Sequence, residues 1–146
     1  MEEIFHLGIK ALFVNDENKV LVLKANPDDF KAETPVHWDL PGGRVEKGHS
    51  IEKTLAKEIE EELGIPGSEI IVERDFHLDI SSMRIPVDNG DVGLVLLVKQ
   101  CRLARERAFT LNFEHTEYKW VSIQAAKELL SFKFSKGFID KLDELG

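Results

Sequence analysis

One segment in the middle of the chain constrains the fold more than any other, because it joins a glycine turn to the clearest helical pattern. The Pro-Gly-Gly of residues 41–43 breaks any regular element, and apolar side chains at helical spacing follow over 50–63. Ser50 is of the type that caps helix N-termini, and Gly64 stands where a terminating glycine is expected. The pattern predicts a helix over 50–63 that buries one face against a larger body.

The flanking segments are richer in β-branched and apolar runs bounded by turn residues, which is typical of strands. We expect the first two runs to form a hairpin around the polar turn 15–18. One central helix among strands, with helices at the end, predicts an α/β fold with a mixed sheet covered on both faces. The expected strands are 4–14, 20–23, 37–40, 69–80, 92–103 and 117–121, and the expected later helices are 123–130 and 135–145.

Composition bounds the size and the partners. The 146 residues, 42% of them hydrophobic and without an apolar run of the ~20 residues a membrane span needs, predict a single domain over 1–146. The net charge of −8 excludes a fold that wraps nucleic acid, and a polyanionic substrate would need a divalent cation beside this protein. Cys101 alone forms no intramolecular disulfide, and the first residues lack a basic secretory leader, so we expect a cytoplasmic protein.

Three carboxylates share one face of the predicted helix. Glu58, Glu61 and Glu62 have i, i+3 and i+4 spacing, and like charges so placed oppose helix formation by a few tenths of a kcal/mol per pair. A hard cation such as Mg²⁺ or Mn²⁺ would reverse that repulsion. A solvated acidic face is the alternative interpretation, and the adjacent Gly42–Gly43 turn, which can present a backbone carbonyl, favours the metal site.

The segment 43–65 resembles the Nudix hydrolase signature, G-x5-E-x7-R-E-U-x-E-E-x-G-U, in which U is a bulky aliphatic residue. The segments 38–43 and 114–121 are also similar to the family's usual sequence on either side of this box. The pattern departs at His49, where the family has Glu, and at Lys57, where it has Arg. The matching positions are Gly43, Glu58, Ile59, Glu61, Glu62, Gly64 and Ile65.

The resemblance implies a Nudix-type α/β/α sandwich that hydrolyses a diphosphate linkage in a nucleotide, such as a nucleoside triphosphate or a dinucleoside polyphosphate. It implies Mg²⁺ or Mn²⁺ as cofactor, held by the Gly42 carbonyl, Glu58, Glu61 and Glu62, with Glu58 either a ligand or the base that takes a proton from water. These three glutamates are the expected catalytic residues. A further ligand is expected outside the box, with Glu114 first and Glu117 second.

Other positions concern the substrate and the two departures. Arg44 and Lys24 are candidate phosphate contacts, and Trp38 or Phe30 is a candidate base-stacking residue. Lys57 keeps the positive charge of the family's arginine without its bidentate fork. His49 is open to three interpretations: a metal ligand, a helix cap, or neither.

Two other functions compete with hydrolysis. A Nudix-fold module that binds a ligand without useful turnover draws support from the two departures, whereas the intact helix carboxylates favour an enzyme. An isomerase that uses a cysteine is poorly supported, because Cys101 stands in an apolar strand with no motif around it. The expected partner is a small nucleotide rather than nucleic acid or membrane, and because many members of the family are dimers, a homodimer is also considered.

Overall fold

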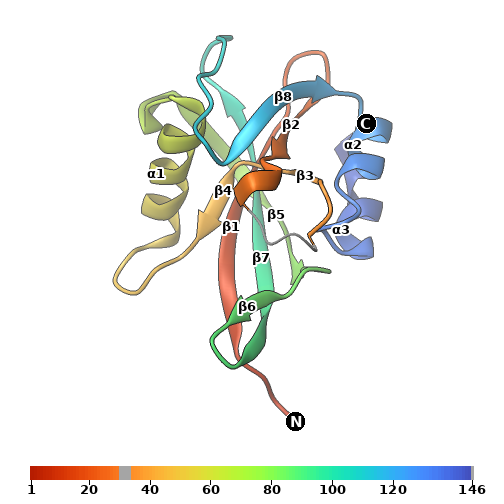
Figure 1. The fold of residues 1–146 in the computed structure, drawn as a ribbon. Coiled ribbons are helices and arrows are strands. Elements are labelled where there is room, and N and C mark those ends of the chain that lie inside the picture. The colour runs from red at the N-terminus through yellow and green to blue at the C-terminus, as the bar shows by residue number, and fades with distance from the viewer. Residues whose placement is uncertain (30–33, 146) are drawn as a thin grey trace.

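Two β-sheets lie between helices that cover them from opposite sides (Figure 1). The computed structural model describes residues 1–29 and 34–145, so the candidate base-stacking residue Phe30 lies outside the described residues. The larger sheet has the order β4-β1-β7-β5, with β6 also paired to β7, and the smaller sheet has the order β3-β2-β8. The larger sheet contains β1 (Phe5–Phe13), β4 (Gly42–Arg44), β5 (Ile70–Ile80), β6 (Ile85–Val87) and β7 (Gly90–Leu103).

The smaller sheet contains β2 (Val20–Ala25), β3 (Trp38–Asp39) and β8 (His115–Val121). Helix α1 lies on one side of the sheets, and the C-terminal helices α2 and α3 lie on the other (Figure 1). The helices are α1 (Ile51–Leu63), α2 (Ile123–Leu129) and α3 (Lys136–Lys141), with 3-10 turns η1 (Pro27–Asp29), η2 (Gly67–Glu69) and η3 (Leu142–Leu145). The predicted α/β sandwich with a mixed sheet is confirmed.

Strand β1 is the centre of the larger sheet. It runs parallel to β7, from Phe5 opposite Gly93 to Phe13 opposite Cys101, and antiparallel to β4. The predicted hairpin between β1 and β2 is wrong, because these strands meet only at one bridge between Val14 and Val20. Strand β1 lies between β4 and β7 in the larger sheet, and β2 lies between β3 and β8 in the smaller one. The chain therefore passes from one sheet to the other at the turn between β1 and β2.

Alternate residues of β1 and β2 enter two different cores. On the α1 side, Leu55, Ile59 and Leu63 pack against the odd-numbered residues of β1 and β2. On the other side, the even-numbered residues Leu12, Val20 and Val22 pack with Ala126, Leu130, Phe134, Phe138 and Leu142 of the C-terminal segment. Burial on both strand faces is what fixes the positions of the helices.

Helix α1 has the ends that the sequence predicts. The Ser50 hydroxyl accepts a hydrogen bond from the Lys53 N–H at 3.1 Å, and Gly64 ends the helix with a φ of 71°. This left-handed conformation lets the Gly64 N–H reach the Glu60 carbonyl at 2.9 Å. The last turn of α1 is thereby held beside β4, where the glycine turn lies.

The remaining predicted elements are present with shifted limits. Strand β8 begins at His115, two residues earlier than expected, and the loop after β5 contains the additional strand β6. The expected helix over 135–145 divides into α3 and the tighter turn η3. Among the described residues, none of the helices has the length and apolar character that a membrane crossing requires.

Candidate active site

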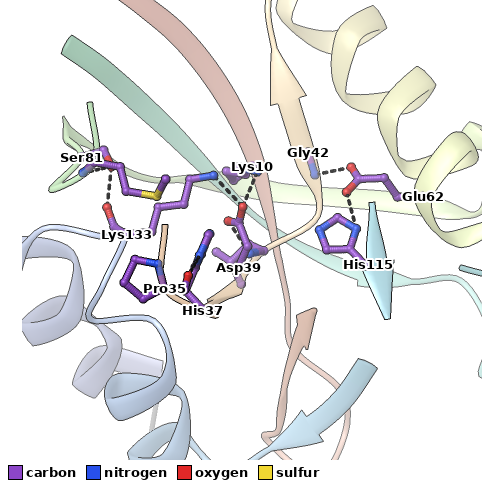
Figure 2. A network of polar contacts seen from close by, with 11 residues as sticks. Lys10, Pro35, His37, Asp39, Gly42, Glu62, Ser81, His115 and Lys133 are labelled. Carbon is purple, nitrogen blue, oxygen red and sulfur yellow. Dashed lines mark hydrogen bonds and ion pairs between the residues drawn. The ribbon is translucent and has the colours of Figure 1, made fainter. Parts of the chain in front are cut away.

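Glu62 is a completely buried carboxylate at the junction of α1, β4 and β8 (Figure 2). The Gly42 N–H donates a hydrogen bond to its Oε1 at 2.8 Å, and its Oε2 lies 3.3 Å from Nδ1 of His115. Within the described part of the chain, this Oε2 and this Nδ1 have no hydrogen-bond partner. Burial raises the pKa of Glu62 to about 8, although the Lys10 ammonium and the Gly42 N–H oppose that shift.

The two glycines before the helix serve different purposes. Gly42 has a φ of 147°, and a Cβ there would collide with the Ile9 carbonyl oxygen, so only glycine fits against β1. A Cβ on Gly43 would instead lie 2.5 Å from Cδ of Glu58. Gly42 therefore makes the turn possible, and Gly43 leaves the space that the Glu58 carboxylate occupies.

Glu58 lies half-buried next to this turn. Burial raises its pKa, and the negative charges of Glu61 and Glu114 add to that effect. Glu61 is exposed, and its Oε1 lies 3.8 Å from the Lys57 ammonium one turn earlier. Of the three carboxylates predicted to converge, Glu58 and Glu62 line the glycine turn, and Glu61 lies at the solvent side.

A second segment enters the site just before β8. Ligand atoms of Glu62, Glu114 and His115 lie within 4.8 Å of one another. The segment is fixed by Asn26, whose N–H donates to the Glu114 carbonyl at 2.9 Å and whose side-chain amide donates to the Phe113 carbonyl at 2.7 Å. Burial lowers the pKa of His115 to about 4, so its imidazole is neutral at neutral pH.

These groups fit a divalent cation. Among the described residues, the buried Glu62 Oε2 accepts no hydrogen bond. The neutral His115 offers a ring nitrogen, and Glu114 adds a carboxylate that is open to solvent. A buried carboxylate with a raised pKa is stabilised in its charged form by a nearby cation. Carboxylate oxygens with one imidazole are ligands that Mn²⁺ and related ions accept.

The structure places several predicted residues away from this cluster. Arg44 is exposed on β4, 3.3 Å from Nδ1 of His6, and Lys24 is on β2 opposite Trp38 and Glu117. Among the residues that the structure describes, no hydrogen bond or ion pair joins Arg44 or Lys24 to the glutamates of the site. Arg44 shares the short strand β4 with both glycines, whereas Lys24 lies on the other sheet.

Other candidates have ordinary structural surroundings. Glu117 pairs with Lys119 at 3.6 Å, and the same ammonium lies 5.1 Å from the centre of the Trp38 ring. Cys101 is buried in the α1-side core, and burial raises the pKa of its thiol to about 12, which does not suit a nucleophile. His49 is exposed before the first turn of α1, roughly 20 Å of helical rise from Glu62.

Sequence reasoning missed two parts of this region. His115 was not among the predicted ligands, although it directly follows Glu114, which was. Asp39, next to the glycine turn, is buried between the ammonium groups of Lys10 and Lys133, at 3.1 and 2.6 Å (Figure 2). These lysines stand 29 and 94 residues from Asp39, so no local motif reveals the cluster.

The fold and the box now define the class of protein. The chain belongs to the Nudix family: the family model of the NUDIX domain matches residues 4–142. It is 31% identical over 103 residues to an RNA pyrophosphohydrolase of Campylobacter jejuni, an alignment that covers 64% of each chain. It is 27% identical over 109 residues to the asymmetrical bis(5'-nucleosyl)-tetraphosphatase of Sus scrofa, covering 72% of this chain and 69% of the relative.

Solved structures show the same fold at lower identity. The E. coli dihydroneopterin triphosphate pyrophosphohydrolase superposes with a TM-score of 0.71 and 20% identity, covering 94% of this chain and 92% of that one. A C. elegans Ap4A hydrolase gives 0.69 and 17%, covering 97% and 96%. The two-sheet architecture with helices on both sides is therefore shared with these proteins.

Proposed function

We propose that this protein is a hydrolase that cleaves a phosphoanhydride bond in a nucleoside polyphosphate, with Mg²⁺ or Mn²⁺ as cofactor. The observation that carries the proposal is the buried Glu62 oxygen without a hydrogen bond, next to Glu114 and His115. Family membership and the relatives that act on nucleotides support the same reaction.

The metal-holding residues would be Glu62 and Glu114, with Glu61 at the solvent side and the Gly42 carbonyl as a neutral ligand. Of its two expected roles, Glu58 takes that of the base. His115 is added to this set because its ring nitrogen faces Glu62. A bound divalent cation would supply charge neutralisation for the diphosphate and lower the pKa of water. In a molecule with a net charge of −8, such neutralisation is needed before a polyphosphate can approach.

Glu58 is the proposed general base. Water attacks a phosphorus atom, the bond from that phosphorus to the bridging oxygen breaks, and Glu58 accepts the proton that water releases. A carboxylate with a raised pKa holds that proton better than an ordinary one, and Glu58 is half-buried beside the glycine turn. Glu62 is fully enclosed and held by the Gly42 N–H, which suits it to a fixed ligand role.

Arg44 is the proposed phosphate contact, since it is exposed on the strand that carries both glycines. Lys24 is a weaker proposal for the same role because it lies on the other sheet. The cytoplasm, where nucleotides and Mg²⁺ are abundant, is the proposed location, and sedimentation analysis would test the proposed homodimer.

A phosphate-release panel tests the function. Nucleoside triphosphates, dinucleoside polyphosphates and nucleotide sugars are incubated with Mg²⁺ or Mn²⁺, with Glu58→Gln and the exposed Glu60→Gln compared to the natural protein. We expect turnover of at least one polyphosphate, lost in Glu58→Gln and kept in Glu60→Gln. Tight nucleotide binding without any phosphate release would instead identify a ligand-sensing module.

A second candidate substrate is the triphosphorylated 5' end of RNA, favoured by the similarity to the Campylobacter RNA pyrophosphohydrolase. The net charge excludes wrapping of a nucleic acid, and a 5' end requires only its phosphates and first nucleotides to enter the site. Release of pyrophosphate from a short 5'-triphosphorylated RNA, at a rate above that from free nucleoside triphosphates, would assign this substrate.

A further inference from the structure

A buried ion cluster lies next to the glycine turn, on the side away from Glu62 (Figure 2). Asp39 Oδ2 accepts hydrogen bonds from the ammonium groups of Lys10, at 3.1 Å, and Lys133, at 2.6 Å. The side chains of Lys10 and Asp39 are 7% and 8% exposed, and that of Lys133 is 13% exposed. One lysine is enough to neutralise Asp39. The second buried ammonium group is therefore not explained by the charge of Asp39 alone.

Lys133 reaches this cluster from the loop that joins α2 to α3. Its carbonyl accepts hydrogen bonds from the Ser81 hydroxyl at 2.5 Å and from the Ser82 N–H at 3.0 Å. The backbone of this residue is therefore fixed at the end of β5, and the side chain extends inward from a defined point. Lys133 thus connects the C-terminal helical layer to the strand segment that precedes Gly42.

The segment 39–42 transmits that position to the metal site. Asp39 Oδ1 accepts the Leu40 N–H at 2.7 Å, and the Pro41 carbonyl accepts the Ala11 N–H from β1 at 2.8 Å. Gly42 lies opposite Lys10 in the β1–β4 ladder, and its N–H then donates to Glu62. Every link from the Lys133 ammonium to the Glu62 carboxylate is a hydrogen bond or a short piece of backbone.

Asp39 and Glu62 are also linked electrostatically, through Lys10. The Lys10 ammonium is attracted by both Asp39 and Glu62. Because the Lys133 ammonium also binds Asp39, Lys10 is not the sole counter-charge of Asp39. The Lys10 ammonium can therefore also stabilise a negative charge on Glu62, across the β1–β4 ladder. The Lys10 ammonium therefore lies between the two carboxyl groups, hydrogen-bonded to Asp39 and electrostatically coupled to Glu62 across the glycine turn.

We propose that Lys133 is a positioning residue for the metal site: by holding Asp39, it fixes the segment 39–42 and, through Gly42, the orientation of Glu62. The inference rests on the proposed function, since Glu62 has a ligand's role only where a cation is bound. Groups that orient metal ligands through hydrogen bonds typically change metal affinity 10–100-fold when removed.

Mn²⁺ binding, followed by the loss of the free-ion EPR signal, tests this without reference to turnover. Lys133→Met is compared with Lys127→Met, a matched control in the same helical layer whose ammonium pairs with Asp143 at 3.0 Å and whose side chain is 20% exposed. We expect an Mn²⁺ Kd about tenfold weaker in Lys133→Met, and within about twofold of the natural protein in Lys127→Met.

Two further variants guard against a loss of folding. Lys133→Arg keeps the charge and is expected to bind Mn²⁺ within about threefold of the natural protein, while Lys133→Gln keeps a donor without charge and is expected to fall between Arg and Met. At saturating substrate, the kcat of Lys133→Met should be reduced when the metal concentration is low and should recover at high Mn²⁺. Equal affinity in the natural protein and in every folded Lys133 variant would overturn the positioning role alone, whereas a natural protein that does not bind Mn²⁺ would overturn the proposed function with it.

Discussion

Two buried acids, Asp39 and Glu62, lie on either side of the Gly42 turn, and their surroundings shift their pKa values in opposite directions. Asp39 is enclosed by two ammonium groups, and although burial alone would raise its pKa, Lys10 and Lys133 hold it well below the usual range. Glu62 is buried as deeply, with one backbone N–H and a neutral imidazole beside it, and its pKa rises to about 8. Asp39 is therefore hydrogen-bonded to two cations, whereas Glu62 interacts with Lys10 only at a distance.

This difference separates an acid that supports the fold from one that awaits a partner. A buried charge without a counter-charge is costly, and it persists in folded proteins mainly where a function needs it. Asp39 has its counter-charges within the chain, so its removal should affect folding. Among the described residues, Glu62 has no cationic group in hydrogen-bond contact, so its removal should affect chemistry.

The largest expected effect is on turnover. Glu62→Gln keeps the shape and the hydrogen bond from Gly42, and should lower kcat/KM by at least about 10³-fold, because a neutral amide holds a cation poorly. The free energy of unfolding without metal should stay within about 1 kcal/mol, since burying an amide costs no more than burying this carboxyl group. Activity assays and urea unfolding check the two halves; natural turnover with Mg²⁺ present would remove Glu62 from the site.

Asp39→Asn should lower stability far more than Glu62→Gln does. It leaves two buried ammonium groups without their anion, and breaking a buried ion pair in this way lowers stability by about 3–5 kcal/mol. Urea unfolding measures the loss. The surface change Asp140→Asn, which breaks the exposed pair with Lys136, is the control and should leave stability almost unchanged. A neutral result for Asp39→Asn would mean that the cluster does not stabilise the fold.

Low pH should reduce the stability difference between the natural protein and Asp39→Asn. Because the pKa of Asp39 is lower in the folded chain than in the unfolded one, its contribution is complete above the unfolded value near 3.8 and is lost as the pH falls toward the folded value. The stability advantage of the natural protein over Asp39→Asn should therefore shrink below pH 4, by at most about 1.4 kcal/mol per pH unit. Paired unfolding curves at pH 5, 4 and 3 measure it; a constant difference would contradict the charged state assigned to Asp39.

The smallest effect is expected at Gly43. Gly43→Ala puts a methyl group where Glu58 packs, so activity should fall about tenfold with less than about 1 kcal/mol of destabilisation. Gly42→Ala meets the Ile9 carbonyl at a positive φ and should destabilise the fold by more than Gly43→Ala does. Thermal unfolding and initial rates separate the two; an equal loss of stability in both variants would contradict their different roles.

Local pattern was enough to predict that Glu58 and Glu62 lie together beside the glycine turn. The capped helix, the glycine turn and the spacing of Glu58 and Glu62 are all contained within about twenty residues, and helical geometry alone places them together. Glu114 was found only through the resemblance to a family, because nothing local connects it to α1. His115 was missed because a lone histidine at the start of a strand has no pattern of its own.

Long-range placement could not be predicted in the same way. The hairpin between β1 and β2 was predicted, wrongly, from a polar turn between two apolar runs. That pattern gives no sign that β4 and β7 occupy the two edges of β1. The partners of Asp39 depend on how the C-terminal loop packs, so Lys133 had no signal in the sequence. The individual helices and strands were therefore predicted well, whereas the pairing of the strands and the polar cluster that joins distant segments were not.

The parallel pairing of β1 with β7 also has a consequence for how the protein is made. Strand β1 pairs with a strand that ends 90 residues after β1 does, at Leu103. At 5–20 residues per second, synthesis of the intervening chain takes roughly 5–20 s. During that interval the apolar side chains of β1 have only β4, a three-residue strand, as a neighbour in the larger sheet. Nascent chains of this protein are accordingly most exposed to chaperones and to misassociation before β7 is complete, and slow folding is expected from contacts so far apart in the chain.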